Sequence, residues 1–262
     1  IVMTVIETVM LLFGGMSFFE SLLHTFGTAG TGGFGLKRDS LASYSPYIQW
    51  VITAFMILFG VNFNLYYLII IKKLKTAVKS RELWFFFAVI GISTLLITFN
   101  IRYLFGNFSE TLRTAFFQVA SIISTTGYAT ADFNTWPQFS RYLILLLMFF
   151  GGCAGSTAGG MKMSRIMMLF KLIRNETQRL IHPRAVTSLR FEGKTLDGAT
   201  SRNLSNYFLI YFVCLAVIVL LPCGEPFSFL TNFSAAVSCF NNVGPGLDAG
   251  GPASNYAAYS DF

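Results

Sequence analysis

Charged residues are scarce in this sequence. Asp, Glu, Lys and Arg together make up 12% of its 262 residues, whereas soluble domains usually contain about 25%. Hydrophobic residues make up 54% of the chain, phenylalanine alone occupies 29 positions, and the mean hydropathy is +0.60. Too few polar residues remain to cover a soluble domain of this size, so the composition indicates a membrane protein.

Histidine and cysteine are also rare, with two and four residues. Their spacing forms no CxxC pair and no cluster with carboxylates that would suit a transition metal. No nucleophile is recognisable beside a base and an orienting acid, so the sequence predicts no enzyme. His24 is expected to be packed or hydrogen-bonded, and His182, before Pro183, to mark a helix end. The cysteines are expected to be small buried residues: Cys153, Cys214, Cys223 and Cys239.

Four long stretches contain no charged residue at all. A helix needs about 20 apolar residues to cross a bilayer, and each stretch approaches or exceeds that length. Buried helices of a soluble protein are the alternative, but four of them would leave too little polar surface. The sequence therefore predicts several membrane spans. The uncharged stretches are 51–71, 83–101, 142–161 and 203–224.

Most of the basic residues lie in two segments. Five of the 19 Lys and Arg lie between Lys72 and Arg81, and nine more lie between Lys162 and Arg202. An excess of Lys and Arg marks the cytoplasmic side of a membrane protein. The span Tyr47–Ile71 is therefore expected to run inward and Leu83–Ile101 outward, which places residues 102–140 on the outer side. Because the basic residues flank spans instead of forming a stripe with aromatic residues, nucleic-acid binding is not expected.

A short apolar helix followed by a glycine-containing return recurs three times. Each helix is too short to span the bilayer, so we expect it to enter the membrane from outside and the chain to return. The central glycines Gly33, Gly127 and Gly244 are separated by 94 and 117 residues. Ser109 is the expected N-cap of the second helix, with Glu110 in its first turn. The predicted pairs are Met16–Phe26 with Thr31–Gly35, Thr111–Ile123 with Thr125–Ala129, and Phe227–Phe240 with Asn242–Gly246.

The three returns have a composition that suits a cation filter. Glycine permits a positive φ, which lets successive carbonyl oxygens face one axis and replace the hydration shell of an ion. The preceding helices direct the negative ends of their dipoles at the same place. Asp132 can concentrate cations at the outer mouth or be a solvated loop carboxylate. The predicted filter residues are Thr31, Gly32, Gly33, Phe34, Thr125, Thr126, Gly127, Tyr128, Asn242, Val243, Gly244 and Pro245.

The stretch GGCAGSTAGG, residues 151–160, interrupts an apolar run. Five of its ten residues are glycine, and each lowers helix stability by roughly 1 kcal/mol, so we expect the helix to break there. Since the earlier inner span has only Gly60, the break is expected in this repeat alone. Close packing of small residues is the alternative; a phosphate loop is excluded by the missing Gly-Lys-Ser/Thr ending. The predicted gating-loop residues are Gly151, Gly152, Gly155, Ser156, Thr157, Gly159 and Gly160.

An amphipathic helix is predicted after this stretch, over Met163–Ile181. Basic residues recur among apolar ones at Arg165, Lys171, Arg174 and Arg179. Such a helix leaves the membrane on its cytoplasmic side. It can serve as a docking surface for a partner or as an anchor that faces lipid.

Taken together, these motifs resemble the Trk/Ktr/HKT superfamily of potassium transporters, most closely its TrkH/TrkG type. The resemblance rests on TAGTGGFG, SIISTTGYATADFNTWP, GGCAGSTAGGMK, LIHPRAV and NNVGPGL, which occur in the family's order over nearly the whole chain. It implies an all-α membrane protein with span, re-entrant pore helix and span units arranged pseudo-fourfold around one ion pore. The chain would then comprise 1–80 as a second repeat with a truncated first span, 81–182 as a third, 183–204 as a cytoplasmic loop, and 205–262 as a fourth without its closing span.

The same resemblance implies the function and partners. It implies potassium uptake across the bacterial cytoplasmic (inner) membrane, with the returns as filter and residues 151–160 as the intramembrane gating loop. It further implies a homodimer and a cytoplasmic nucleotide-binding regulatory subunit of the TrkA type. Potassium would be the substrate, no cofactor would be covalently bound, and a nucleotide would act only through the regulatory partner.

Three other functions compete with a channel-like potassium transporter. A member of the same family can conduct sodium as well as potassium. An ion-coupled secondary transporter also uses broken helices near the midplane, but its repeats are inverted, whereas these units share one orientation. A non-transporting membrane scaffold gives no reason for three glycine returns.

Overall fold

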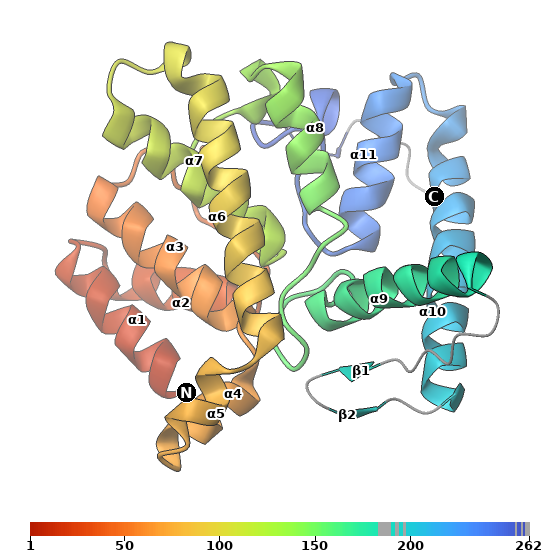
Figure 1. The fold of residues 1–262 in the computed structure, drawn as a ribbon. Helices are drawn as coiled ribbons and strands as arrows, with labels where there is room; N and C mark the ends of the chain where they lie inside the picture. The colour runs from red at the N-terminus through yellow and green to blue at the C-terminus, as the bar shows by residue number, and fades with distance from the viewer. Residues whose placement is uncertain (183–189, 192–193, 196–197, 255, 258, 260–262) are drawn as a thin grey trace.

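The computed structural model describes residues 1–182, 190–191, 194–195, 198–254, 256–257 and 259. In this part of the chain the regular secondary structure is helical except for one antiparallel pair of two-residue strands, β1 (Arg190–Phe191) and β2 (Lys194–Thr195) (Figure 1). The all-α fold predicted from the sequence is thus confirmed. The helices are α1 (Val2–Phe13), α2 (Phe18–Ala29), α3 (Pro46–Gly60), α4 (Phe63–Ile70), α5 (Leu74–Val78), α6 (Arg81–Ile101), α7 (Phe108–Ile123), α8 (Gln138–Leu147), α9 (Met163–Ile181), α10 (Gly198–Leu220) and α11 (Phe229–Phe240).

Two helices in the described part are long and apolar enough to cross a membrane unbroken. They are α6 with its 3-10 extension, Arg81–Leu104, and α10 with its extension, Gly198–Gly224, of 24 and 27 residues. Ser80 begins α6, where its side chain accepts a hydrogen bond from the backbone N–H of Leu83. These helices contain the predicted stretches 83–101 and 203–224.

The apolar stretch 51–71 is broken, which corrects the prediction of one continuous span over Tyr47–Ile71. Helices α3 and α4 meet at a bend of 90°. Val61 is extended, and Asn62 starts a new helix because its side chain accepts a hydrogen bond from the N–H of Asn64 at 2.9 Å. The expectation that only residues 151–160 interrupt an inner span was therefore wrong.

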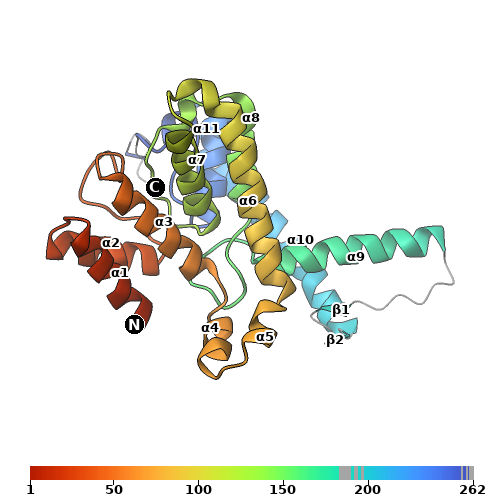
Figure 2. The same cartoon turned by 60° about the vertical axis from the view of Figure 1, so that its left-hand side comes forward.

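The apolar run 142–161 is broken as predicted. Helix α8 ends at Leu147, and the chain has no regular structure until α9 begins at Met163. We refer to residues 148–162 as the 148–162 loop. From its end, α9 extends away from the other helices, as the turned view shows (Figure 2).

The three short helices α2, α7 and α11 each begin at a polar side-chain cap. Ser17 and Glu20 form a capping box on α2, and Ser228 caps α11. Helix α7 begins earlier than expected, because Asn107 and not Ser109 is its N-cap; the Asn107 side chain accepts a hydrogen bond from the Ser109 N–H at 3.1 Å. Glu110 lies in the first turn, as predicted.

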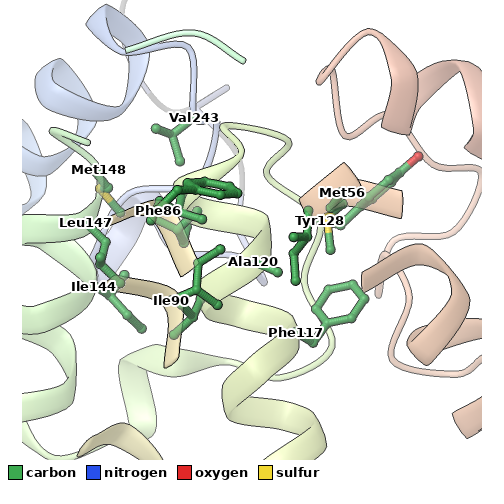
Figure 3. Close-up of a cluster of buried hydrophobic side chains, with 14 of the residues drawn as sticks. Met56, Phe86, Ile90, Phe117, Ala120, Tyr128, Ile144, Leu147, Met148 and Val243 are labelled. Atoms are coloured by element: carbon green, nitrogen blue, oxygen red, sulfur yellow. The ribbon is translucent and has the colours of Figure 1, made fainter. Parts of the chain in front are cut away.

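Side chains from α3, α6, α7 and α8 form one buried cluster (Figure 3). Phe86 of α6 and Phe117 of α7 are fully buried there, together with Tyr128, which follows α7. Because lipid is as apolar as these side chains, close packing and polar contacts must supply the stability. The cluster packs the segments that follow α7 and α8 against α3 and α6.

The prediction that the cysteines are buried holds for one of the four. Cys153 is buried, whereas Cys214, Cys223 and Cys239 are exposed. An apolar stretch in a membrane protein has both an inward face and a face suited to lipid. Apolar neighbours in the sequence therefore do not show whether a cysteine lies on the buried face or on the exposed face.

Candidate functional site

The returns after α2, α7 and α11 share one backbone conformation. In each, the first residue has a positive φ, and so does the glycine two positions later. A left-handed conformation costs roughly 1–2 kcal/mol for a residue other than glycine, so its recurrence indicates that the surrounding contacts impose it. The φ values are 51° at Thr31 and 64° at Gly33, 55° at Thr125 and 84° at Gly127, and 58° at Asn242 and 106° at Gly244.

The same backbone hydrogen bond closes each short helix. The N–H of the second return residue donates to the carbonyl oxygen five positions earlier in all three copies. The corresponding bonds are Gly32 to Gly27 at 2.8 Å, Thr126 to Ser121 at 2.9 Å, and Val243 to Ser238 at 2.8 Å. These bonds turn the chain sharply where each helix ends, so the return begins at the C-terminal end of its helix.

The returns lie directly against one another. A Cβ atom at Gly33 would overlap the carbonyl oxygen of Thr126, and a Cβ atom at Gly127 would overlap that of Val243. At Gly244 a Cβ atom would have ordinary contact, 3.9 Å from the Cα of Gly127. The first two glycines are thus required both by φ and by space, whereas the third is required by φ.

Tyr128 connects the second return to the first. Its ring is fully buried, and its hydroxyl donates to the carbonyl oxygen of Phe34 at 3.0 Å, with His24 Nδ1 at 3.2 Å. His24 is therefore a packed, hydrogen-bonded residue, as predicted. Ser40 adds a second connection, because its hydroxyl accepts from the N–H of Ala129 at 3.1 Å. Phe34, the residue equivalent to Tyr128, is instead 77% exposed.

The 148–162 loop touches the first residue of every return. The Thr31 hydroxyl donates to the carbonyl oxygen of Thr157 at 3.3 Å, and the Gly159 N–H donates to the Thr125 hydroxyl at 2.6 Å. A Cβ atom at Gly159 would lie 3.0 Å from the Cβ of Asn242. Because these first residues directly follow the C-terminal ends of α2, α7 and α11, the loop lies where the three returns begin.

The break between α3 and α4 holds the same loop. The Cys153 N–H donates to the carbonyl oxygen of Gly60 at 2.8 Å, and the Phe63 N–H donates to that of Gly155 at 3.2 Å. Freed backbone groups of one broken span thus pair with those of the other, which satisfies both away from water. The glycines of this loop serve close backbone packing in an irregular segment, and not packing between helices.

Lys162 closes the loop on itself. Its ammonium group donates to the carbonyl oxygens of Ser156, at 3.4 Å, and Ala158. Gly155 and Gly160 have φ values of 71° and 65°, which favour glycine. A Cβ atom at Gly151 would overlap the carbonyl oxygen of Gly159. The loop therefore has one specific backbone conformation, held by its own hydrogen bonds and close contacts.

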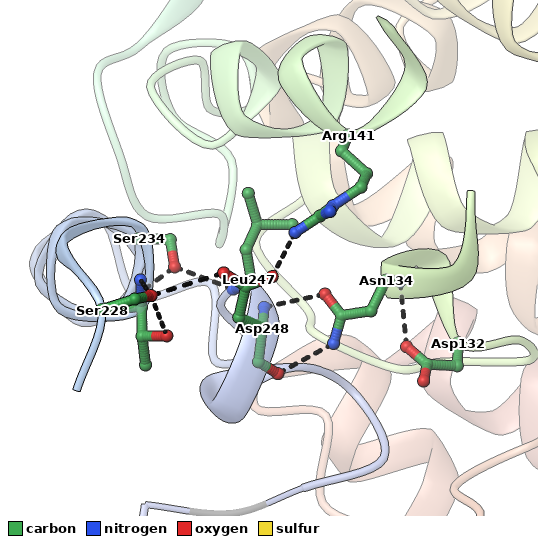
Figure 4. A network of polar contacts seen from close by, with 8 residues as sticks. Asp132, Asn134, Arg141, Ser228, Ser234, Leu247 and Asp248 are labelled. Carbon is green, nitrogen blue, oxygen red and sulfur yellow. Dashed lines mark hydrogen bonds and ion pairs between the residues drawn. The ribbon is translucent and has the colours of Figure 1, made fainter. Parts of the chain in front are cut away.

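A polar network joins the segment after α7 to the segment after α11 (Figure 4). The Asn134 side chain accepts from the N–H of Asp248 and donates to its carbonyl oxygen, both at 2.9 Å, and Arg141 forms an ion pair with the Asp248 carboxylate. Asp132 positions Asn134 by accepting its N–H at 2.9 Å. Asp132 also lines a cavity of about 310 Å³ with Arg38 and other residues.

Sequence reasoning missed several of these residues. Asn134 and Asp248 are 114 positions apart, and no local pattern indicates that they meet. Asn62 did carry a signal, because an asparagine two residues after Gly60 is a typical helix start. In the segment between α2 and α3, the Tyr44 hydroxyl donates to the Glu20 carboxylate at 3.3 Å. Burial, aided by the Glu20 charge, raises the pKa of Tyr44 to about 12, so the hydroxyl stays protonated and remains a donor.

Comparison with known proteins identifies the family. The sequence profile of the TrkH family, described as a cation transport protein, matches residues 4–261. The chain belongs to the TrkH family. It is 32% identical to the Trk system potassium uptake protein TrkG of Escherichia coli, over 95% of this chain and 51% of that protein. It is 33% identical to the Trk system potassium uptake protein TrkH of Escherichia coli, over 94% of this chain and 52% of that protein.

A solved structure of the TrkH family has the same fold. The crystal structure of the potassium transporter TrkH from Vibrio parahaemolyticus matches with a TM-score of 0.88 at 30% identity, over 94% of this chain and 54% of that one. This TrkH-family chain therefore spans about half the length of the relatives it matches. Its residues predicted for a filter lie in three adjoining returns, and those predicted for a gate lie against them; both roles stay predictions.

Proposed function

We propose that this chain forms much of a potassium uptake pathway, with the three returns as parts of its filter. The observation that carries the proposal is the shared backbone of the returns, in which carbonyl groups of Thr126 and Val243 adjoin the glycines of the neighbouring return. Carbonyl oxygens arranged in this way replace the water around a potassium ion. In the proposed pore, units of this kind surround one axis with pseudo-fourfold symmetry.

The electrostatics of the short helices support a cation as the substrate. The returns begin at the C-terminal ends of α2, α7 and α11, and each such end carries about half a negative charge. The names of the Escherichia coli relatives, both potassium uptake proteins, support potassium as that cation. The pathway needs no covalently bound cofactor.

The 148–162 loop is the proposed gate of this pathway. Its bonds to Thr31 and Thr125 support the proposal, because they hold the loop against the first residues of two returns. An irregular segment at membrane depth is stable only where protein covers it or where it lines a cavity. The segment contains no helix, so in this proposal the loop moves aside without unfolding one.

The proposed protein is a homodimer in the bacterial inner membrane with a regulatory subunit of the TrkA type on its cytoplasmic side. Helix α9 supports such a partner, because it extends from the other helices and exposes Arg174 and Arg179 (Figure 2). In this proposal, a nucleotide controls transport only by binding the partner.

A pathway that also admits sodium is the second candidate. The observation that favours it is the third return, where Val243 and Pro245 replace the threonine and aromatic residue of Thr126 and Tyr128. A filter built from unlike segments selects less strictly than one with identical segments.

Uptake of rubidium by potassium-starved cells tests the proposal directly. In cells that lack their own potassium transporters, expression of the full-length protein is expected to produce saturable rubidium uptake. Potassium should compete strongly with rubidium and sodium weakly. Competition by sodium as strong as that by potassium would favour the second candidate, and absence of uptake in a correctly inserted protein would contradict both.

Replacing Tyr128 with phenylalanine is expected to lower selectivity severalfold while uptake persists. The change removes the hydroxyl that bonds Phe34 across two returns, and one such bond contributes roughly 1 kcal/mol. The measurement is the ratio of sodium to potassium concentrations that halve rubidium uptake. Tyr142→Phe is the matched control, because the Tyr142 side chain is 56% exposed; an equal shift in both variants would refute a special role for Tyr128.

A further inference from the structure

Glu82 joins three parts of the molecule through one oxygen atom. It lies in the first turn of α6 and is 4% exposed. Its Oε1 accepts a hydrogen bond from the N–H of Ala154 in the 148–162 loop at 2.6 Å. The same atom accepts one from the N–H of Ser164 in the first turn of α9 at 3.0 Å. Helix α6, the loop and α9 therefore meet at this carboxylate.

The carboxylate supplies a cap that α9 lacks in its own sequence. Lys162 is the N-cap residue of α9 and makes no side-chain capping bond. The first N–H groups of a helix need acceptors, and the positive end of the helix dipole favours an anion. Hydrogen bonds to a charged acceptor are about twice as strong as neutral ones, so Glu82 holds both Ala154 and Ser164 firmly.

Helix α9 is a long helix that is held at its first turn and is largely exposed toward its far end. Its 19 residues span about 28 Å at 1.5 Å per residue. Its buried residues all lie in the first turns, namely Met163, Ser164 and Ile166, whereas Leu180 near its far end is 84% exposed. A force on the exposed end acts on the buried first turn, where the bond to Glu82 is located.

We propose that Glu82 is the anchor that couples α9 to the 148–162 loop. With both bonds made, the loop stays under the returns; when α9 shifts, the shared acceptor shifts or is lost, and Ala154 is released. The proposal rests on the proposed function in that the loop is taken as the gate. It adds the residue through which a movement on the cytoplasmic side reaches that gate.

Cys153 provides a direct readout, because it is buried and precedes Ala154. Its reaction with N-ethylmaleimide in native membranes is quantified by mass spectrometry of the Cys153 peptide over a range of pH. The pH dependence separates exposure of the thiol from the effect of the Glu82 charge on its ionisation, so the rate reports release of the loop independently of transport. In the full-length protein, Glu82→Ala is expected to raise this rate by roughly tenfold or more, since two charge-assisted bonds are lost. Glu82→Gln keeps an acceptor but loses the charge and is expected to raise it severalfold.

The matched control is Glu110→Ala. Glu110 is also an acidic residue in the first turn of a helix, α7, but it is exposed. Its replacement should leave the Cys153 rate unchanged. An unchanged rate in Glu82→Ala would overturn the proposal. If that variant fails to insert, an unchanged rate in Glu82→Gln would overturn it instead.

Rubidium flux separates this proposal from the proposed gate. Glu82→Ala should raise basal flux in the intact protein and have no further effect once residues 155–159 are deleted. A further effect in the deleted protein would mean that Glu82 acts by another route, which overturns the coupling. If deletion alone leaves flux unchanged, the gate is refuted, while the Cys153 rate still decides whether Glu82 holds the loop.

Discussion

Replacing Gly127 with serine is expected to remove most of the discrimination between potassium and sodium. Gly127 has a φ of 84°, and any Cβ atom there would overlap the carbonyl oxygen of Val243. The serine must therefore displace that carbonyl or change its own backbone, at a cost of roughly 1–2 kcal/mol for φ alone. Because 1.4 kcal/mol corresponds to a factor of about ten, we expect selectivity to fall at least tenfold.

The geometry also predicts an order among the three glycines. Gly33→Ser should be as damaging as Gly127→Ser, since its Cβ atom would overlap the carbonyl oxygen of Thr126. Gly244→Ser should be milder, because a Cβ atom there meets only ordinary contact and the strain comes from a φ of 106°. The measurement is sodium competition against rubidium uptake for each variant at matched expression.

Gly91→Ser is the matched control for this series. Gly91 lies within α6, and nothing is within 4 Å of a Cβ atom built there. The same chemical change should leave both uptake and selectivity intact. If Gly127→Ser kept normal selectivity, the assignment of the returns as a filter would be wrong.

The returns could be predicted because their signal is local. Thr125, Thr126 and Gly127 interrupt an apolar run, and equivalent interruptions recur around Gly33 and Gly244. Polar residues and glycine in such a place need a structural reason, and recurrence supplies it. What could not be predicted is how the returns are held, since Tyr128 reaches Phe34 across 94 positions.

The break between α3 and α4, in contrast, is not evident from the composition of the sequence. Asn62 starts a new helix in a run that contains no charged residue and few polar ones, and composition alone favours a continuous span. The bend exposes backbone groups of Gly60 and Phe63, which then pair with Cys153 and Gly155. A single break would leave these groups unpaired in the membrane, so the two breaks depend on each other.

The contacts that hold the 148–162 loop determine which elements can move the proposed gate. The 148–162 loop is held by three separate sets of contacts: the returns through Thr31 and Thr125, the bend at Gly60, and the anchor at Glu82. Only the first of these three sets involves residues of the returns. The loop can therefore be moved by elements that do not touch the proposed ion path.

Deleting residues 155–159 is expected to raise basal rubidium flux strongly and to abolish its regulation. The deletion removes the Thr157 carbonyl and the Gly159 N–H, which bond Thr31 and Thr125. The shortened segment then has neither of the hydrogen bonds that hold it against Thr31 and Thr125. The measurement is rubidium flux through the deleted and the intact protein, compared in the same cells under the same conditions.

Selectivity provides the internal control for the deletion. The glycines and carbonyl groups of the returns are untouched, so the deleted protein should still prefer potassium to sodium, whereas Gly127→Ser should lose selectivity yet stay regulated. Gly127→Ser should thus change selectivity and not regulation, whereas the deletion should change regulation and not selectivity. Normal, fully regulated flux after the deletion would refute the gate, and a joint loss of selectivity would mean that the loop supports the returns instead of closing them.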